Sequence, residues 1–284
     1  VRKNLSDERV NHIILLTDGQ TYGDEEECLV LAEEAEDIGI GISGLGIGKD
    51  WNDDFLDELA AKTGSSSRYI AEPQEIQEFL EEKFEQLAKV FAENVELEFQ
   101  TPSAVDLSYI FRLQPNAAHL SSEKELQLGV ILRDQSLSLI LEFSINPAAV
   151  LEDKVDLLTG SLKFEIPSQS LAAQPMRVRI SRNVTEQASL EPPSPTLVHA
   201  LANLNLYRMQ ETAQEDVASG KYNEASRRLQ HLATHLLSNG ERSMAKTVLL
   251  EAENLQQQQS FSEEGRKNIK YGTRALLLPA GKGK

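Results

Sequence analysis

The sequence has little of several features that direct interpretation toward membrane or disulfide-rich proteins. Its 284 residues include one cysteine and one tryptophan, and no apolar run approaches the roughly 18 residues that a membrane helix needs. The sequence therefore predicts no transmembrane segment. The lone Cys28 excludes an internal disulfide and is expected to pack in a core as a small apolar residue. With no signal peptide visible after Val1, these features favour a cytoplasmic location.

Positive charge is scarce in the first part of the chain. The net charge is −17, and residues 1–100 carry all of it, with 25 acidic and 8 basic side chains. This acidic part would repel phosphates, which argues against nucleic-acid binding and favours cations or basic partners. Residues 101–284 are balanced, so the composition predicts a boundary near residue 100.

Residues 1–92 show an alternation of apolar strands and amphipathic helices. His12–Leu16 and Ile40–Ile47 read as buried strands, and "SRYIA" reads as a third. Helices are predicted for 24–37 and for "WNDDFLDELAAKTG", and a long one after Pro73. The stripe expected on the long helix comprises Ile76, Phe79, Leu80, Phe84, Leu87, Ala88 and Phe91. This order predicts a parallel sheet covered by helices, with three strands too few to stand alone.

The middle of the chain changes to a period of two. Six alternating segments predict antiparallel strands with one buried face: "VELEF", "LSYIFRL", "LQLGVILRD", "LSLILEFSI", "GSLKFEI" and "MRVRI". Strands of this kind, separated by polar or proline-containing turns, are typical of a β-sandwich.

Beyond the proline-rich stretch 190–196, the spacing becomes helical again. Helices are predicted for 197–219, 222–237 and 244–258, broken at Gly220 and at Asn239-Gly240, which indicates a small helical bundle. The predicted fold is therefore multidomain, with α/β, all-β and α parts. The predicted boundaries are 1–92, 93–187 and 188–276, followed by a flexible tail, 277–284.

Several motifs match known sites only in part. The string Gly39-x-Gly41-x-x-Gly44 lies within a predicted strand, where a dinucleotide fingerprint must end a strand and open a helix. His231 and His235 have the spacing of zinc ligands on a helix, but Leu232 stands where a metalloprotease has its glutamate. We expect both histidines at a helix surface or an interface.

The candidate site residue is Asp18, which follows the first strand in the sequence Thr17-Asp18-Gly19. In open α/β sheets, ligands bind at the carboxyl ends of the strands, so a carboxylate there is a candidate ligand. The alternative is a residue that only shapes the turn, with Thr17 and Gly19 as its structural neighbours.

Three stretches resemble the second half of a von Willebrand factor type A domain: "HIILLTDGQTYGDE", "DIGIGISGLGIGKDWNDDFLDELAAKTGSSSRYI" and "EIQEFLEEKF". The resemblance covers about residues 10–92. It implies a Mg²⁺ or Mn²⁺ ion in a metal-ion-dependent adhesion site, where a carboxylate of a protein partner completes the coordination. The family's ligands are an Asp-x-Ser-x-Ser loop, a threonine and the aspartate that maps onto Asp18.

The Asp-x-Ser-x-Ser loop would precede Val1, so this chain resembles a domain without its front half. Magnesium needs octahedral oxygen coordination, and one carboxylate plus water holds it weakly, so no tightly bound metal is expected in this chain. The sandwich and helices that follow resemble stand-alone bacterial type A proteins described as calcium-activated-channel-like, with a layout similar to inter-alpha-trypsin inhibitor heavy chains.

The leading hypothesis is a non-enzymatic protein that binds an acidic group of a partner protein through a divalent cation. A structural scaffold with an incomplete or vestigial metal site is one alternative. The other is a metal-dependent hydrolase or phosphatase with Asp18 as nucleophile, which is disfavoured because position 20 is Gln where a second aspartate is needed.

Overall fold

The computed structural model describes residues 5, 9–20, 23–120, 125–150, 153–167, 175–185 and 192–277. Contacts divide the chain into two compact units, one of residues 1–46 and 52–190 and one of residues 47–51 and 191–284. The predicted tail lies outside the described residues except for Leu277. No helix of the described residues is long and apolar enough to cross a membrane.

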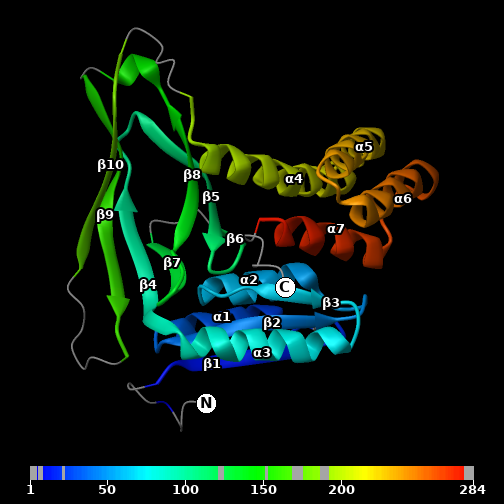
Figure 1. The fold of residues 1–284 in the computed structure, drawn as a ribbon, viewed down its shortest axis with the longest axis horizontal. Coiled ribbons are helices and arrows are strands. Elements are labelled where there is room, and N and C mark those ends of the chain that lie inside the picture. The colour runs from blue at the N-terminus through cyan, green and yellow to red at the C-terminus, as the bar shows by residue number, and fades with distance from the viewer. Residues whose placement is uncertain are drawn as a thin grey trace. The chain divides into compact units, whose positions relative to one another are not determined.

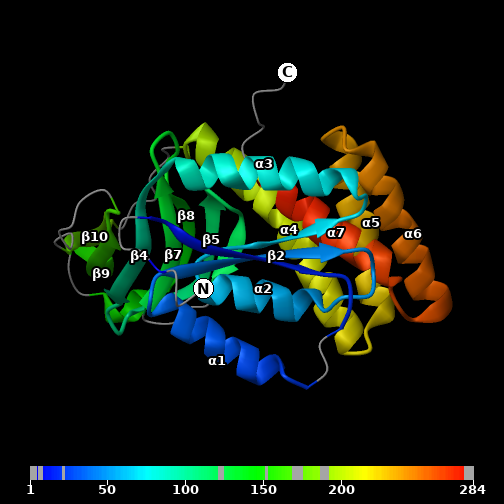
Figure 2. The same ribbon diagram turned by 90° about the horizontal axis from the view of Figure 1, so that it is seen from below.

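The first unit begins with a three-stranded sheet in the order β1-β2-β3, with β1 and β2 parallel (Figure 1). Helices α1 and α2 lie on one side of this sheet and α3 on the other (Figure 2). The elements are β1 (Asn11–Thr17), α1 (Glu25–Glu36), β2 (Ile40–Ile47), α2 (Asp53–Lys62), β3 (Ser67–Ile70) and α3 (Gln74–Ala88). The predicted parallel sheet with its covering helices is therefore confirmed.

Because side chains alternate along each strand, the parallel sheet packs against helices on both of its faces. Ile13, Ile40 and Ile42 join a core with Ala32 and Leu59 of α1 and α2. His12, one position from Ile13, points to the opposite side of the sheet, toward α3. Asn52 caps α2, because its side chain accepts a hydrogen bond from the backbone N–H of Phe55 at 3.1 Å.

Three expectations for this part were wrong in detail. The first strand is not fully buried: among the described residues it lies at the edge of its sheet, and Leu15 and Leu16 are exposed. Phe84 is 62% exposed while Lys83 is buried in its place, and Phe91 lies in the next strand because α3 ends at Ala88. Cys28 is only partly buried, against the edge of its core.

The rest of the first unit is an antiparallel sandwich. One sheet has the order β10-β9-β4-β7 and the other β6-β5-β8, and residues of both form one apolar core. The strands are β4 (Val90–Gln100), β5 (Val105–Gln114), β6 (Ala118–Leu120), β7 (Glu125–Leu132), β8 (Ser138–Ile145), β9 (Lys154–Glu165) and β10 (Met176–Asn183). The predicted sandwich is confirmed; β6, of three residues, is the strand that alternation did not reveal.

Within this unit, the buried guanidinium of Arg112 connects the parallel sheet to the sandwich. Arg112 on β5 is 1% exposed and donates to the carbonyl oxygens of Gly64, Ser65, Asn116 and Leu128 at 2.6–2.9 Å. Gly64 precedes β3, whereas Asn116 and Leu128 belong to the sandwich. The arginine therefore joins the turn before β3 to the sandwich without any carboxylate.

The second unit contains four helices, α4 (Pro195–Ala218), α5 (Tyr222–Ser238), α6 (Arg242–Gln258) and α7 (Glu263–Ala275). Their core is aliphatic, with Leu229, Leu232, Val248 and Leu255 fully buried. The breaks at Gly220 and at Asn239-Gly240 are confirmed.

Helix α7 was not predicted, because much of the face that it buries consists of polar or charged residues such as Lys267, Lys270 and Thr273. Trp51 belongs to this unit, and its side chain is buried. The ring centroids of Trp51 and Tyr271 are 5.7 Å apart, and the Lys267 ammonium lies 5.2 Å from the centre of the indole.

Candidate functional site

Asp18 lies where the sequence placed it, directly after β1. Thr17 pairs with Gly46 near the end of β2, so the carboxyl ends of the two parallel strands meet at one edge of the sheet. The hydroxyl of Thr17 donates to the carbonyl oxygen of Gly19 at 3.2 Å, which holds the turn. The side chain of Asp18 is exposed and can act as a metal ligand at this edge.

Asp18 belongs to no group of three or more potential metal ligands among the described residues. Their one group of three potential metal ligands lies elsewhere, on the sandwich. Asp18 by itself can supply a single oxygen ligand, and the remaining positions around a hard cation would be filled by water. His231 and His235 are exposed on α5 and belong to no such group among the residues described.

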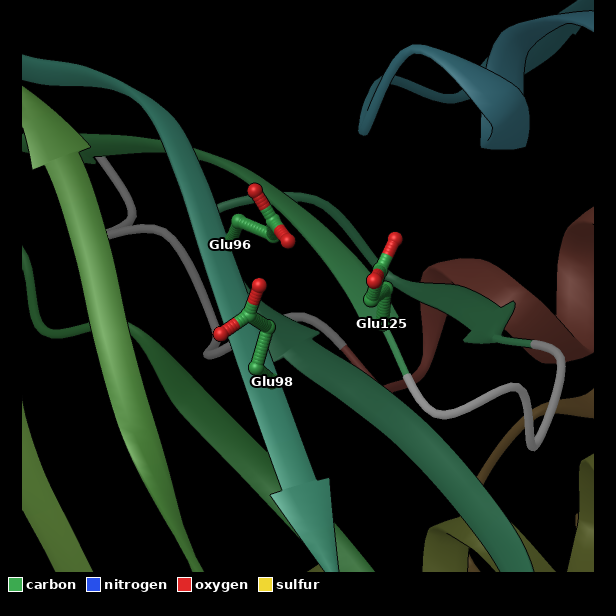
Figure 3. A group of neighbouring side chains, drawn as sticks. All are labelled: Glu96, Glu98 and Glu125. Atoms are coloured by element: carbon green, nitrogen blue, oxygen red, sulfur yellow. The ribbon is translucent and has the colours of Figure 1, made fainter.

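The group on the sandwich consists of Glu96, Glu98 and Glu125, whose carboxylates lie close together (Figure 3). Glu96 and Glu98 are two residues apart on β4, so they share the face opposite the core positions Val95, Leu97 and Phe99. The strand register pairs Glu98 with Glu125 of β7. One ligand atom of each residue lies within 4.8 Å of the others.

A lysine already balances part of this acidic cluster. Lys163 of β9 is paired with Glu96 in the register, and its ammonium donates to the carboxylate of Glu98. That hydrogen bond raises the pKa of Lys163. Burial is the largest cause of the raised pKa of Glu96; Glu125 and Glu98 add to it, and Lys163 opposes it. The cluster can hold a hard cation only in competition with Lys163.

Sequence reasoning identified the strand around Glu96 but not this cluster. The signal present was Glu-x-Glu in "VELEF", which puts two carboxylates on one face of a strand. The third member depends on the register between β4 and β7, and no local pattern reports that register.

Comparison with known families decides what the first part of the chain is. Residues 2–88 match the model of the von Willebrand factor type A domain. The chain carries a type A domain at its N-terminal end. Residues 195–279, which include α4 to α7, match the model described as "Sll0103-like, C-terminal alpha-helical domain". Type A domains typically mediate protein–protein interactions and often use a divalent metal.

One curated relative and two solved structures are similar to this chain. The "Uncharacterized protein sll0103" of Synechocystis sp. is 25% identical over an alignment of 285 positions, which covers 96% of this chain and 67% of the relative. The solved structure titled "von Willebrand factor type A from Catenulispora acidiphila" has a TM-score of 0.68 at 16% identity. Human COPII-coat protein Sec24c has a TM-score of 0.50 at 14% identity.

This chain spans only part of these solved structures. It covers 66% of the Catenulispora acidiphila chain and 40% of Sec24c, whereas 94% and 93% of its own residues are aligned. At these identities the two structures show the fold alone.

Proposed function

We propose that this chain is part of a non-enzymatic interaction protein whose type A domain binds an acidic group of a partner protein through Mg²⁺ or Mn²⁺ at Asp18. The observation that carries the proposal is the position of Asp18, exposed at the carboxyl edge of the parallel sheet inside a domain that matches the type A model. A bound divalent cation with an open coordination position is a ready acceptor for a carboxylate oxygen.

The further ligands in this proposal come from a segment that precedes Val1 in the full-length protein. Two features of the described residues support that view. Strand β1 has β2 as its one strand partner among them, and Leu15 and Leu16 beside that free edge are 38% and 46% exposed. Helices α1 and α3 also expose apolar side chains, with Val30 at 54% and Phe84 at 62%. Additional strands and helices would cover such surfaces.

The proposal is tested by calorimetric titration of the full-length protein and of residues 1–284 with Mg²⁺ and Mn²⁺. We expect binding by the full-length protein, weak or undetectable binding by residues 1–284, and loss of binding at least tenfold with Asp18→Asn. Asp106→Asn, at an exposed position on β5, is the matched control. If neither protein binds either metal, the type A domain is a scaffold with a vestigial site and the proposal fails.

A further inference from the structure

A cavity lined by charged side chains lies in the first unit, at the edge of the parallel sheet opposite Asp18. This cavity of about 40 Å³ lies between the starts of β1 and β2 and the strands β4 and β7 of the sandwich. A water molecule needs roughly 10–15 Å³ measured in this way, so the cavity has room for about three waters or one small ion. Its polar wall includes His12, Lys83, Glu93, Asn94 and Gln127.

Lys83 is the unusual member of this wall. It comes from α3 and is only 8% exposed, although it carries an ammonium group. No carboxylate of the described residues lies within ion-pair distance of that group, and no hydrogen bond to it is formed by them. Burial and, to a smaller extent, the nearby Arg112 guanidinium lower the pKa of Lys83 to about 8, and Glu82 opposes both effects. With a pKa of about 8, the Lys83 ammonium is protonated in most molecules at neutral pH.

The other groups around the cavity do not neutralise this charge. Arg112 directs four hydrogen bonds to backbone carbonyls, so it adds positive charge without a carboxylate partner. Burial, together with Lys83, lowers the pKa of His12 to about 3, so its ring is neutral. Burial and the neighbouring Glu165 raise the pKa of Glu93 to about 7, and burial is the largest cause of the raised pKa of Glu36. Glu93 is therefore only partly ionised at neutral pH and is a poor counter-ion.

We propose that this cavity binds one small monovalent anion, chloride or a short carboxylate such as formate, against the ammonium of Lys83. Lys83 lines the cavity, so an anion in this space would place an opposite charge against its ammonium. The amides of Asn94 and Gln127 and the neutral His12 ring add polar wall to the same space. The site is independent of Asp18, because it lies at the other ends of the parallel strands.

The first test locates the anion directly. Crystals of the protein grown with sodium bromide in place of chloride should show an anomalous bromide peak in the cavity, beside the Lys83 ammonium. A cavity that contains only water, or bromide bound only elsewhere, would overturn the proposal.

The second test measures the melting temperature of residues 1–284 at constant ionic strength in chloride, formate or gluconate, which is too large for the cavity. We expect chloride or formate to raise the melting temperature by about 2–5 °C relative to gluconate. The salt that gives the larger rise identifies the anion. Equal melting temperatures in all three salts would count against the site.

Lys83→Met retains the apolar stem and removes the charge, so it should abolish the difference between the salts. Lys89→Met, at an exposed position directly after the same helix, is the control and should leave the difference unchanged. A difference that persists in Lys83→Met would place the anion elsewhere and overturn the proposal. If that variant does not fold, the bromide experiment on the unaltered protein still decides.

Discussion

Arg112 is the residue whose burial has the clearest consequence for stability. Its guanidinium is 1% exposed, and four carbonyl oxygens depend on it for a hydrogen bond. Burial lowers its pKa to about 10, which leaves it charged at every ordinary pH. These hydrogen bonds offset the desolvation of the guanidinium charge.

Replacing Arg112 by methionine should lower the free energy of unfolding by about 2–4 kcal/mol, because buried carbonyl groups lose their partner. Chemical denaturation of the two proteins measures the difference. Arg133→Met removes an exposed arginine side chain and should change the value by less than about 0.5 kcal/mol. A similar small change for Arg112→Met would show that the guanidinium is not a structural tie.

Glu93 should make the first unit less stable as pH rises. Its pKa is raised to about 7 by burial and by Glu165, above the ordinary value of 4.5, so the folded state binds the proton more tightly than the unfolded state. The resulting stability is fully present below pH 4.5 and is lost as pH rises through 7. From pH 5 to pH 8 the loss should be about 1–3 kcal/mol.

Glu93→Gln should remove this part of the pH dependence, as measured by denaturation at pH 5, 6, 7 and 8. Glu78→Gln, at an exposed position of α3, should keep it. An identical pH profile for the unaltered protein and Glu93→Gln would contradict the assignment.

At the scale of elements, two glycines hold the turn before β3 against strand β7. Gly64 and Gly129 both have positive φ, +64° and +83°. A Cβ at Gly64 would lie 2.5 Å from the Cα of Gly129, and a Cβ at Gly129 would lie 2.1 Å from the carbonyl oxygen of Gly64. The nearest atoms on both sides are backbone atoms, so a change of rotamer cannot relieve these two clashes.

Gly64→Ala and Gly129→Ala should each cost about 2–4 kcal/mol in the free energy of unfolding, from the backbone clash added to the strain of positive φ. Gly23→Ala serves as control, since Gly23 has φ +85° and nothing within 4 Å of its Cβ position. It should cost about 1 kcal/mol. If all three variants are destabilised equally, the contact adds nothing to the effect of φ.

The local sequence pattern was sufficient to predict an element wherever its buried residues recurred with the period of a strand or of a helix. Strand β2 was predicted with its observed bounds, Ile40–Ile47, because an unbroken run of isoleucine, glycine and leucine is typical of a strand buried on both faces. Pattern failed at Phe91, where α3 passes into β4 without a glycine or proline to mark the change. It failed at α7, where polar and charged side chains form much of the buried face.

The candidate sites divide in the same way. Asp18 was predicted as a candidate ligand because a short motif follows a strand, and its position after β1 needs no long-range information. Lys83 lies at the helical spacing of the apolar stripe of α3. This position was the signal in the sequence that could have predicted a buried lysine. Its cavity requires the packing of α3 against the starts of β1 and β2 and against the sandwich, which no spacing within one element contains.

At the scale of the whole chain, the free edge of β1 predicts self-association. Leu15 and Leu16 accompany an edge with no strand partner other than β2 among the described residues, a surface that invites pairing with another copy. Residues 1–284 should form dimers or larger species at tens of micromolar in sedimentation experiments.

Leu16→Lys should shift these species toward monomer. Leu249→Lys, on α6 at a similar exposure of 40% against 46% for Leu16, is the control and should not. A monomeric unaltered chain, or equal effects of the two substitutions, would contradict this prediction.

The central claim concerns where a divalent cation binds, and the full-length protein crystallised with Mn²⁺ tests it most directly. We predict an anomalous manganese peak at about 2.2 Å from a carboxylate oxygen of Asp18, at the carboxyl edge of the parallel sheet. The peak should disappear with Asp18→Asn and persist with Asp106→Asn. Manganese bound only at Glu96, Glu98 and Glu125, or at none of these carboxylates, would contradict the account.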